Sequence, residues 1–164
     1  MINSAGFQVF KDFKRLTYRD LKKSLDINFF SIFRLFRLVE KNLSKNSGFL
    51  INISSIHSSL TKRNFTAYST SKSALTSLTK SLSIEVGDKI TCICIEPGAI
   101  DTGMLNKTLN DKKTYKKLEK NIPVQKIAKP EDIAKIINFL IVSKIRYMNG
   151  SIIDISGGLK NILI

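Results

Sequence analysis

Three short, largely apolar runs mark the chain. They are FLINI at 49–53, ITCICI at 90–95 and SIIDI at 151–155. Apolar runs of this length are typical of strands that are buried on both faces, as the strands of a parallel sheet are. We therefore expect three parallel strands in the protein interior.

Longer segments with apolar residues at helical spacing lie between these runs. Residues 26–43, 66–86 and 130–142 are the clearest, and Pro130 suits the first turn of its helix. A further helix start is indicated at Thr17, a good N-cap residue that Asp20 follows three positions later. The chain thus alternates predicted strands with predicted helices.

The length and composition bound the class of protein. A chain of 164 residues with 43% hydrophobic residues suits one globular domain, residues 1–164, with a sizeable core. No apolar run reaches the roughly 18–20 residues that a membrane span requires. The opening MINSAG has neither a basic segment nor a long apolar one, so we expect no secretory signal and a cytoplasmic location.

The formal net charge of +14 raises the possibility of nucleic acid or an anionic membrane as a partner. The lysines, however, are spread over every predicted helix, and no aromatic residues alternate with them. This favours a solvated basic surface, and nucleic acid is not an expected partner. The densest cluster could instead attract an anionic cofactor or substrate; it comprises Lys107, Lys112, Lys113, Lys116, Lys117 and Lys120.

Cys92 and Cys94 alternate along the predicted strand 90–95, so both side chains should point to one face of the sheet. Such a pair could bind a metal ion, but the chain has no other cysteine, and its one histidine, His57, lies elsewhere. We therefore predict two buried thiols and no metal site.

The candidate chemistry lies between Ser55 and Lys72. Tyr68 follows Ser55 by thirteen positions, and Lys72 follows Tyr68 by four. Residues four apart share one face of a helix, so we expect the Lys72 ammonium near the phenol, where it would lower the tyrosine pKa. A Ser55 hydroxyl alongside could hold an alcohol or carbonyl oxygen against the phenol. This set of groups suits proton transfer at a C–O bond.

Four motifs resemble those of the short-chain dehydrogenase/reductase family: NISS (52–55), YSTSK (68–72), PGAIDT (97–102) and GSIIDISGG (150–158). The resemblance implies an oxidoreductase that interconverts a small-molecule alcohol and a carbonyl with NAD or NADP. Its implied catalytic residues are Tyr68, Lys72, Ser55 and Asn28, the last from the segment DINFF (26–30). The alternative for Asn28 is a local hydrogen bond to its own helix backbone.

The same resemblance implies where the cofactor binds. INSAG (2–6) is similar to the NNAG that ends the family's fourth strand, although Ser4 stands where the family usually has asparagine. The loop after the strand 90–95 would pass the nicotinamide. The implied cofactor-binding residues are Ser4, Ala5, Gly6, Tyr68, Lys72, Pro97, Gly98, Ile100 and Thr102.

The implied fold is a partial Rossmann-like, doubly wound parallel sheet in three α/β/α layers, which retains strands 4-5-6-7 of the family order 3-2-1-4-5-6-7. We accordingly expect an N-terminally truncated member, without the glycine-rich phosphate turn and the adenosine-binding half. Helices 26–43 and 66–86 would form a homo-oligomer, and the helical stretch 102–121 would be a lid over the substrate. The alternative is a remnant or binding module without turnover of its own.

Overall fold

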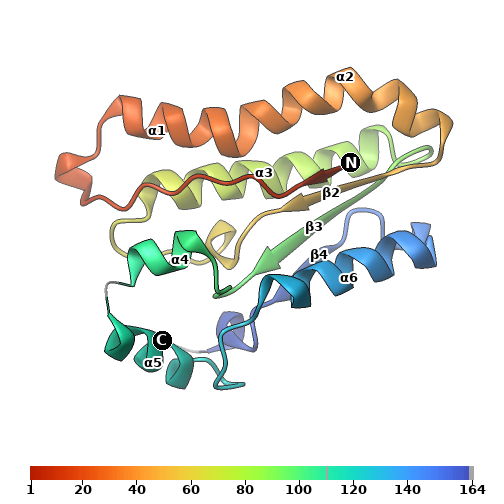
Figure 1. The fold of residues 1–164 in the computed structure, drawn as a ribbon. Helices are drawn as coiled ribbons and strands as arrows, with labels where there is room; N and C mark the ends of the chain where they lie inside the picture. The colour runs from red at the N-terminus through yellow and green to blue at the C-terminus, as the bar shows by residue number, and fades with distance from the viewer. Residues whose placement is uncertain (110, 163–164) are drawn as a thin grey trace.

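The computed structural model describes residues 1–109 and 111–162 and has three layers, with a parallel sheet between two layers of helices (Figure 1). Its strands are β1 (Ile2–Asn3), β2 (Phe49–Ile53), β3 (Thr91–Pro97) and β4 (Ile152–Ile155). They lie side by side in chain order, and each adjacent pair is parallel. The predicted α/β fold with its sequential strand order is confirmed.

One helical layer consists of α1 (Tyr18–Leu25), α2 (Ser31–Lys45) and α3 (Thr66–Glu85), and the opposite face carries α6 (Pro130–Ser143) (Figure 1). Two shorter helices, α4 (Gly103–Thr108) and α5 (Lys112–Asn121), follow β3. Single helical turns complete the fold: Phe13–Arg15, η3 (Ile56–Ser58), Arg146–Met148 and η5 (Leu159–Asn161).

The alternation of side chains along the strands divides the core in two. Ile51 and Ile93 are paired in register and pack with Leu140 of α6. Their neighbours Leu50 and Cys92 are also paired, and they pack on the opposite face with helix α2 through Phe36. Because a strand repeats every two residues, Cys94 faces the same side as Cys92, and its sulfur lies 3.6 Å from Thr76 Oγ1 of α3.

The predicted helix start at Thr17 is confirmed. Thr17 Oγ1 accepts a 3.2 Å hydrogen bond from the Asp20 amide, and Asp20 Oδ2 accepts one of 3.1 Å from the Thr17 amide. This reciprocal capping satisfies two of the backbone donors that a helix start leaves free.

The predicted start of the next helix at Asp26 is wrong. A π-helical turn, η2 (Asp26–Phe30), joins α1 directly to α2, so the helix is continuous from Tyr18 to Lys45. The expected helix 102–121 is instead divided into α4 and α5, because Asp111 caps a new helix and accepts a 2.7 Å hydrogen bond from the Thr114 amide.

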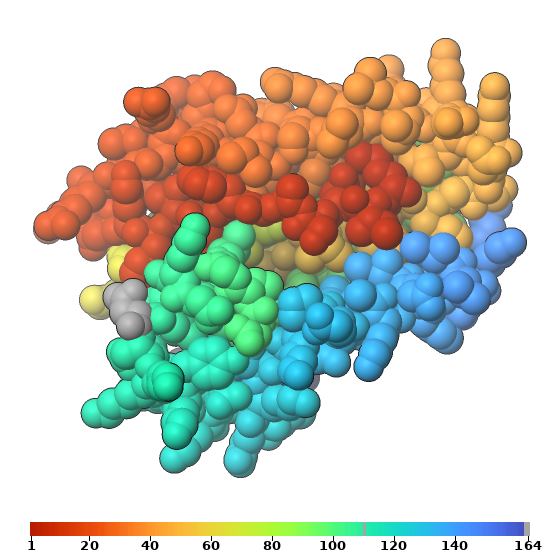
Figure 2. Space-filling model, viewed as in Figure 1, coloured from red at the N-terminus to blue at the C-terminus, as the bar shows by residue number. Residues whose placement is uncertain are grey.

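β1 forms the edge of the sheet and lies at the surface between α2 and α6 (Figure 2). Its Ile2 is 48% exposed. A groove of about 440 Å³ runs beside it, lined partly by Phe49 and Ile141, and another of about 500 Å³ is lined by Leu35 and other residues of α2. An exposed, partly apolar sheet edge of this kind favours pairing with a further chain segment.

Within the part of the chain that the structure describes, no helix is both long and apolar enough to cross a membrane. Among these same residues, His, Cys, Asp and Glu side chains do not gather in groups of three or more that could hold a metal ion.

Candidate active site

The candidate site lies at the carboxyl ends of β2 and β3, where open parallel sheets commonly bind their ligands. Ser54 and Ser55 follow β2 directly, and Gly98 follows the last residue of β3. Tyr68 and Lys72 come from the first turns of α3, which packs across these strand ends.

The structure brings Ser55 and Tyr68 together. The Ser55 side chain lies near enough to the Tyr68 phenol to act on its pKa as a hydrogen-bond partner, and both residues are buried. Ser55 also begins the turn η3, and its Oγ accepts a 3.2 Å hydrogen bond from the His57 amide. The hydroxyl of Ser55 is thereby held by the backbone of the turn that follows it.

Lys72 lies one helical turn beyond Tyr68 and is only 4% exposed. Its Nζ donates a 2.8 Å hydrogen bond to the Ile53 carbonyl and lies 5.9 Å from the centroid of the Tyr68 ring. Burial lowers the pKa of Lys72 to about 8, against a smaller opposing effect of the Cys94 thiol. The ammonium is thus a buried cation bound mainly to backbone.

The pKa of Tyr68 is raised, not lowered. Burial of the phenol is the larger cause, and the hydrogen bond with Ser55 only partly offsets it. Our expectation that Lys72 would lower this pKa is therefore wrong, because desolvation of the phenol dominates and the lysine is engaged with Ile53.

Asn28 lies in the π-helical turn η2 and is fully buried. Its Oδ1 accepts a 2.7 Å hydrogen bond from the Phe7 amide, and its Nδ2 donates to the Phe7 carbonyl at 2.7 Å. Nδ2 also donates to Ser71 Oγ of α3 at 2.8 Å. Asn28 therefore ties the segment after β1 to α3. Within its own helix its side chain contacts the Ser24 hydroxyl at 3.4 Å, and not the helix backbone. Such π-helical turns often occur at functional sites.

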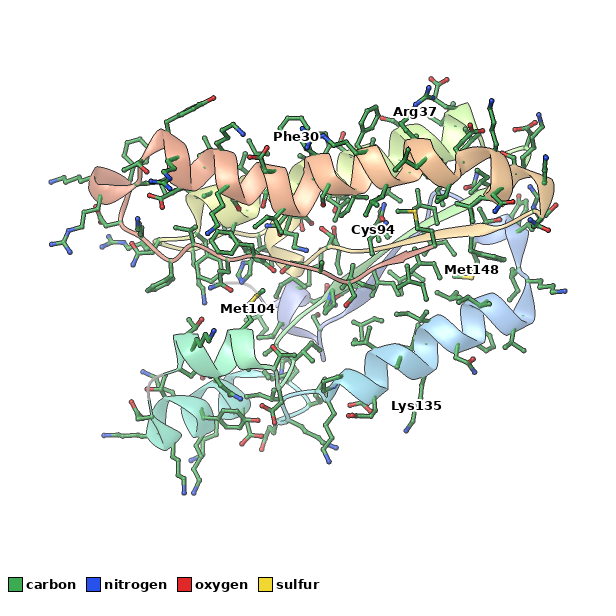
Figure 3. All side chains as sticks on the ribbon, turned by 45° about the horizontal axis from the view of Figure 1, so that its top comes forward. Phe30, Arg37, Cys94, Met104, Lys135 and Met148 are labelled. Carbon is green, nitrogen blue, oxygen red and sulfur yellow. The ribbon has the colours of Figure 1, made fainter. Side chains whose placement is uncertain are left out.

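The segment Ser4–Gly6 follows β1 in irregular, exposed backbone. A Cβ placed on Gly6 would lie 3.7 Å from Lys72 Nζ and 3.6 Å from Cε of Met104, which extends from α4 toward this segment (Figure 3). Gly6 thus lies directly against the Lys72 ammonium.

The loop 97–102 is held close to β4. The Gly98 amide donates a 3.0 Å hydrogen bond to the Ile155 carbonyl, and a Cβ on Gly98 would lie 2.9 Å from Ser156 Cα, so only glycine fits. Ile100 forms a β-bridge with Ala128. Thr102 is exposed, and its hydroxyl donates a 3.4 Å hydrogen bond to the Ile100 carbonyl.

The sequence reasoning missed Glu96, a carboxylate buried at the end of β3. Glu96 is 1% exposed, and its carboxylate accepts hydrogen bonds from Thr76 Oγ1, at 3.0 Å, and from Ser58 Oγ. It also forms an ion pair with Lys160, whose Nζ lies 2.6 Å from Glu96 Oε2. A charged residue that ends an otherwise apolar strand was a signal in the sequence, because buried carboxylates require partners.

A family model described as enoyl-(acyl carrier protein) reductase matches residues 1–160. The 3-oxoacyl-(acyl-carrier-protein) reductase FabG of Buchnera aphidicola is 35% identical over 161 residues, covering 97% of this chain and 65% of that protein. The 7alpha-hydroxysteroid dehydrogenase of Escherichia coli is 31% identical over 160 residues, covering 96% of this chain and 62% of that protein.

Solved structures show the same similarity. A 4-hydroxyisoleucine dehydrogenase complexed with NADH superimposes with a TM-score of 0.91 at 30% identity, covering 99% of this chain and 68% of that chain. A putative gluconate dehydrogenase from Agrobacterium tumefaciens gives a TM-score of 0.91 at 28% identity, covering 99% and 65% of the two chains.

This chain spans 62 to 66% of the length of the curated relatives that it matches. The family model nevertheless matches nearly all of the chain, and the relatives share both its fold and its sequence. The chain therefore belongs to the short-chain dehydrogenase/reductase family.

Proposed function

We propose that this chain carries the substrate side of an NAD(P)-dependent oxidoreductase, which interconverts an alcohol and a carbonyl compound. The observation that supports this most is that the Ser55 side chain lies beside the buried Tyr68 phenol, with the Lys72 Nζ 5.9 Å from the centroid of the Tyr68 ring. Relatives named as reductases and dehydrogenases, at 31 to 35% identity, support the same reaction class.

In the proposed reaction, Tyr68 moves the proton at the substrate oxygen. Its phenol donates to the carbonyl oxygen during reduction and accepts the proton during oxidation, while Ser55 holds the same oxygen by a hydrogen bond. Because burial raises the pKa of Tyr68, the phenol is protonated at neutral pH, which suits the reducing direction.

The residues of this chain fit the nicotinamide side of NAD or NADP, which when bound supplies or takes up the hydride. Gly6 lies against the Lys72 ammonium, and Ser4, Ala5 and Thr102 are exposed. Tyr68 itself, with Pro97, Gly98 and Ile100, would complete the proposed binding surface. Asn28 would keep the segment after β1 in place against α3.

Turnover of the expressed protein tests the proposal. NADH or NADPH oxidation is followed with a panel of ketones and oxoacyl thioesters, in the wild type and in Tyr68→Phe. General acid–base groups typically contribute about 10²–10⁴-fold, so the rate should fall at least that far. Tyr147→Phe is the matched control, because Tyr147 is fully exposed. A Tyr68→Phe protein with an unchanged rate would refute the assignment.

A binding module without turnover is the second candidate. The 164 residues contain no G-x-x-x-G-x-G turn, and this turn followed by a helix N-terminus is the main phosphate-binding device of such folds. This candidate predicts a folded protein that shows no cofactor-dependent turnover with any member of the panel.

A homo-oligomer through η2–α2 and α3 is also proposed. Large apolar side chains are exposed there: Phe33 is 43% exposed, Leu38 80%, and Ile84 of α3 84%. Phe30, 40% exposed, lies on the same continuous helix (Figure 3). Leu38→Lys should lower the mass measured by light scattering, whereas Val142→Lys on α6 should not. The cytoplasmic location remains a prediction from the sequence.

A further inference from the structure

Glu96 connects three elements that are far apart in the sequence. From the end of β3 its carboxylate accepts hydrogen bonds from Thr76 of α3 and Ser58 of η3, and it forms an ion pair with Lys160 of η5. The Glu96 side chain is 1% exposed and that of Lys160 26%.

This ion pair differs from the other pairs among the described residues. The partners in Lys11–Asp20, Lys22–Asp26 and Lys89–Asp88 are between 20% and 71% exposed. Exposed pairs of that kind contribute little, whereas removing one partner of a buried pair typically costs about 3–5 kcal/mol. Lys160 is therefore what allows Glu96 to remain a buried carboxylate.

The turn that Glu96 holds is the one that carries Ser55. Ser58 is the last residue of η3, and its amide donates a 2.9 Å hydrogen bond to the Ser55 carbonyl. On its other side, the Ser58 carbonyl accepts a 2.5 Å hydrogen bond from Ser73 Oγ of α3. Ser58 is thus held through its hydroxyl, its amide and its carbonyl, and its amide joins it to the backbone of Ser55.

We propose that Lys160 and Glu96 form a clamp which, through the Ser58 hydroxyl, holds the turn 55–58 in place against Tyr68. Glu96, Lys160 and Ser58 are then positioning residues for Ser55, and η5 near the end of the described chain takes part in building the site. The consequence for catalysis rests on the proposed function, whereas the clamp itself rests on the contacts alone.

Hydrogen exchange of the Ser58 amide tests the clamp in the protein as it is. Ser58→Ala removes one hydroxyl and no charge, and should lower the protection of the amides at 57 and 58 at least about tenfold, which corresponds to about 1.4 kcal/mol. The ring signals of His57, the only histidine in the sequence, should shift as well. Ser77→Ala on the exposed side of α3 is the matched control and should change neither.

A charge-neutral pair of substitutions separates positioning from general stability. Lys160→Met alone removes the cation that pairs with Glu96, and it should lower the protection of the amides at 57 and 58. Glu96→Gln combined with Lys160→Met keeps a hydrogen-bond acceptor for the Ser58 hydroxyl without a buried charge. The double variant should return protection to within about threefold of wild type. If Lys160→Met fails to fold, Ser58→Ala still decides the matter.

Unchanged protection at residues 57 and 58 in Ser58→Ala would overturn the clamp, whatever the activity. Where turnover is measured, Ser58→Ala should lower kcat by about tenfold, matching the loss of protection, with little change in KM. Lost protection without any turnover would leave the clamp standing and count against the oxidoreductase. Normal turnover with unchanged protection would refute the clamp and leave the oxidoreductase standing.

Discussion

The ammonium of Lys72 donates a 2.8 Å hydrogen bond to the carbonyl of Ile53, and so joins α3 to the last residue of β2. Lys72 is 4% exposed, and burial lowers its pKa to about 8. A lysine in this condition destabilises the fold at neutral pH, because it must be charged where charge is poorly solvated.

We expect Lys72→Met to stabilise the protein at pH 7. A pKa lowered from 10.5 to about 8 means that the buried charge of Lys72 costs roughly 3 kcal/mol of folding stability. The variant also loses the hydrogen bond to Ile53, which should offset about 1 kcal/mol of the gain. Between these two pH values Lys72 binds fewer protons in the folded protein than in the unfolded chain, so the stability advantage of the variant over wild type should shrink as the pH rises. Urea unfolding from pH 7 to 10 measures both, with Lys80→Met, exposed on α3, as the control. A variant less stable than wild type at pH 7 would contradict this account.

Asn28→Ala should destabilise the protein by roughly 2–4 kcal/mol, because it leaves the Phe7 amide and carbonyl without their partner in a buried position. Asn42→Ala is a suitable control, since Asn42 is an exposed residue of α2. Chemical denaturation compares the two. Equal midpoints for both variants would mean that the contacts of Asn28 contribute nothing to the fold.

The buried strands of the sheet could be located from the sequence, because such strands are short and almost entirely apolar, as in FLINI and ITCICI. It was insufficient for the helix that contains Asn28. Asp26 resembles a helix start, but the helix continues through η2 as a wider π-helical turn. In this turn Asn28 makes tertiary hydrogen bonds to Phe7 and Ser71, which a local sequence pattern does not reveal.

The spacing of Tyr68 and Lys72 correctly predicted that the two side chains share one face of a helix, since spacing on a helix fixes which face a residue occupies. It could not predict the direction of the Tyr68 pKa. That direction depends on how deeply the phenol is buried and on where the lysine donates, and both are properties of the packed structure. The Glu96–Lys160 pair joins residues 64 positions apart, so no local pattern reveals it.

Both thiols should be unreactive in the folded protein. Cys92 and Cys94 are 0% exposed, and burial raises the pKa of Cys92 to about 12 and that of Cys94 in the same direction. The thiolate is the reactive form, so Ellman's reagent should label neither residue at pH 8 until denaturant is added, and then both. Rapid labelling of the native protein would show that the strand β3 opens readily.

The phenol of Tyr68 should titrate above the ordinary value of 10.0. The difference in absorbance at 295 nm between wild type and Tyr68→Phe isolates this group, and Tyr18→Phe, removing a tyrosine that is 80% exposed, gives the reference titration. Since the folded protein then binds more protons above pH 10, stability should fall as the pH rises through this range.

Carbonyl reduction should be nearly constant through neutral pH, and alcohol oxidation should increase with pH. A midpoint below 10 would favour activation by Lys72 instead.

The last prediction concerns the affinity of the 164-residue polypeptide, taken by itself, for nicotinamide cofactors. Its sequence holds no glycine-rich phosphate turn, so the groups that remain for binding are those around Gly6, Lys72 and Thr102. We expect millimolar dissociation constants for NADH and NADPH, equivalent to about 4 kcal/mol of binding free energy. Nicotinamide mononucleotide should bind about as well as NADH, because the adenosine half would add no contacts, and AMP should not bind. Calorimetric titration of NADH, nicotinamide mononucleotide and AMP distinguishes these cases, with Thr102→Val expected to weaken the binding of NADH and of nicotinamide mononucleotide alike. Micromolar binding of NADH, with nicotinamide mononucleotide far weaker, would mean that a phosphate and adenosine site is supplied after all, for example by a second copy of the chain at the open edge of β1.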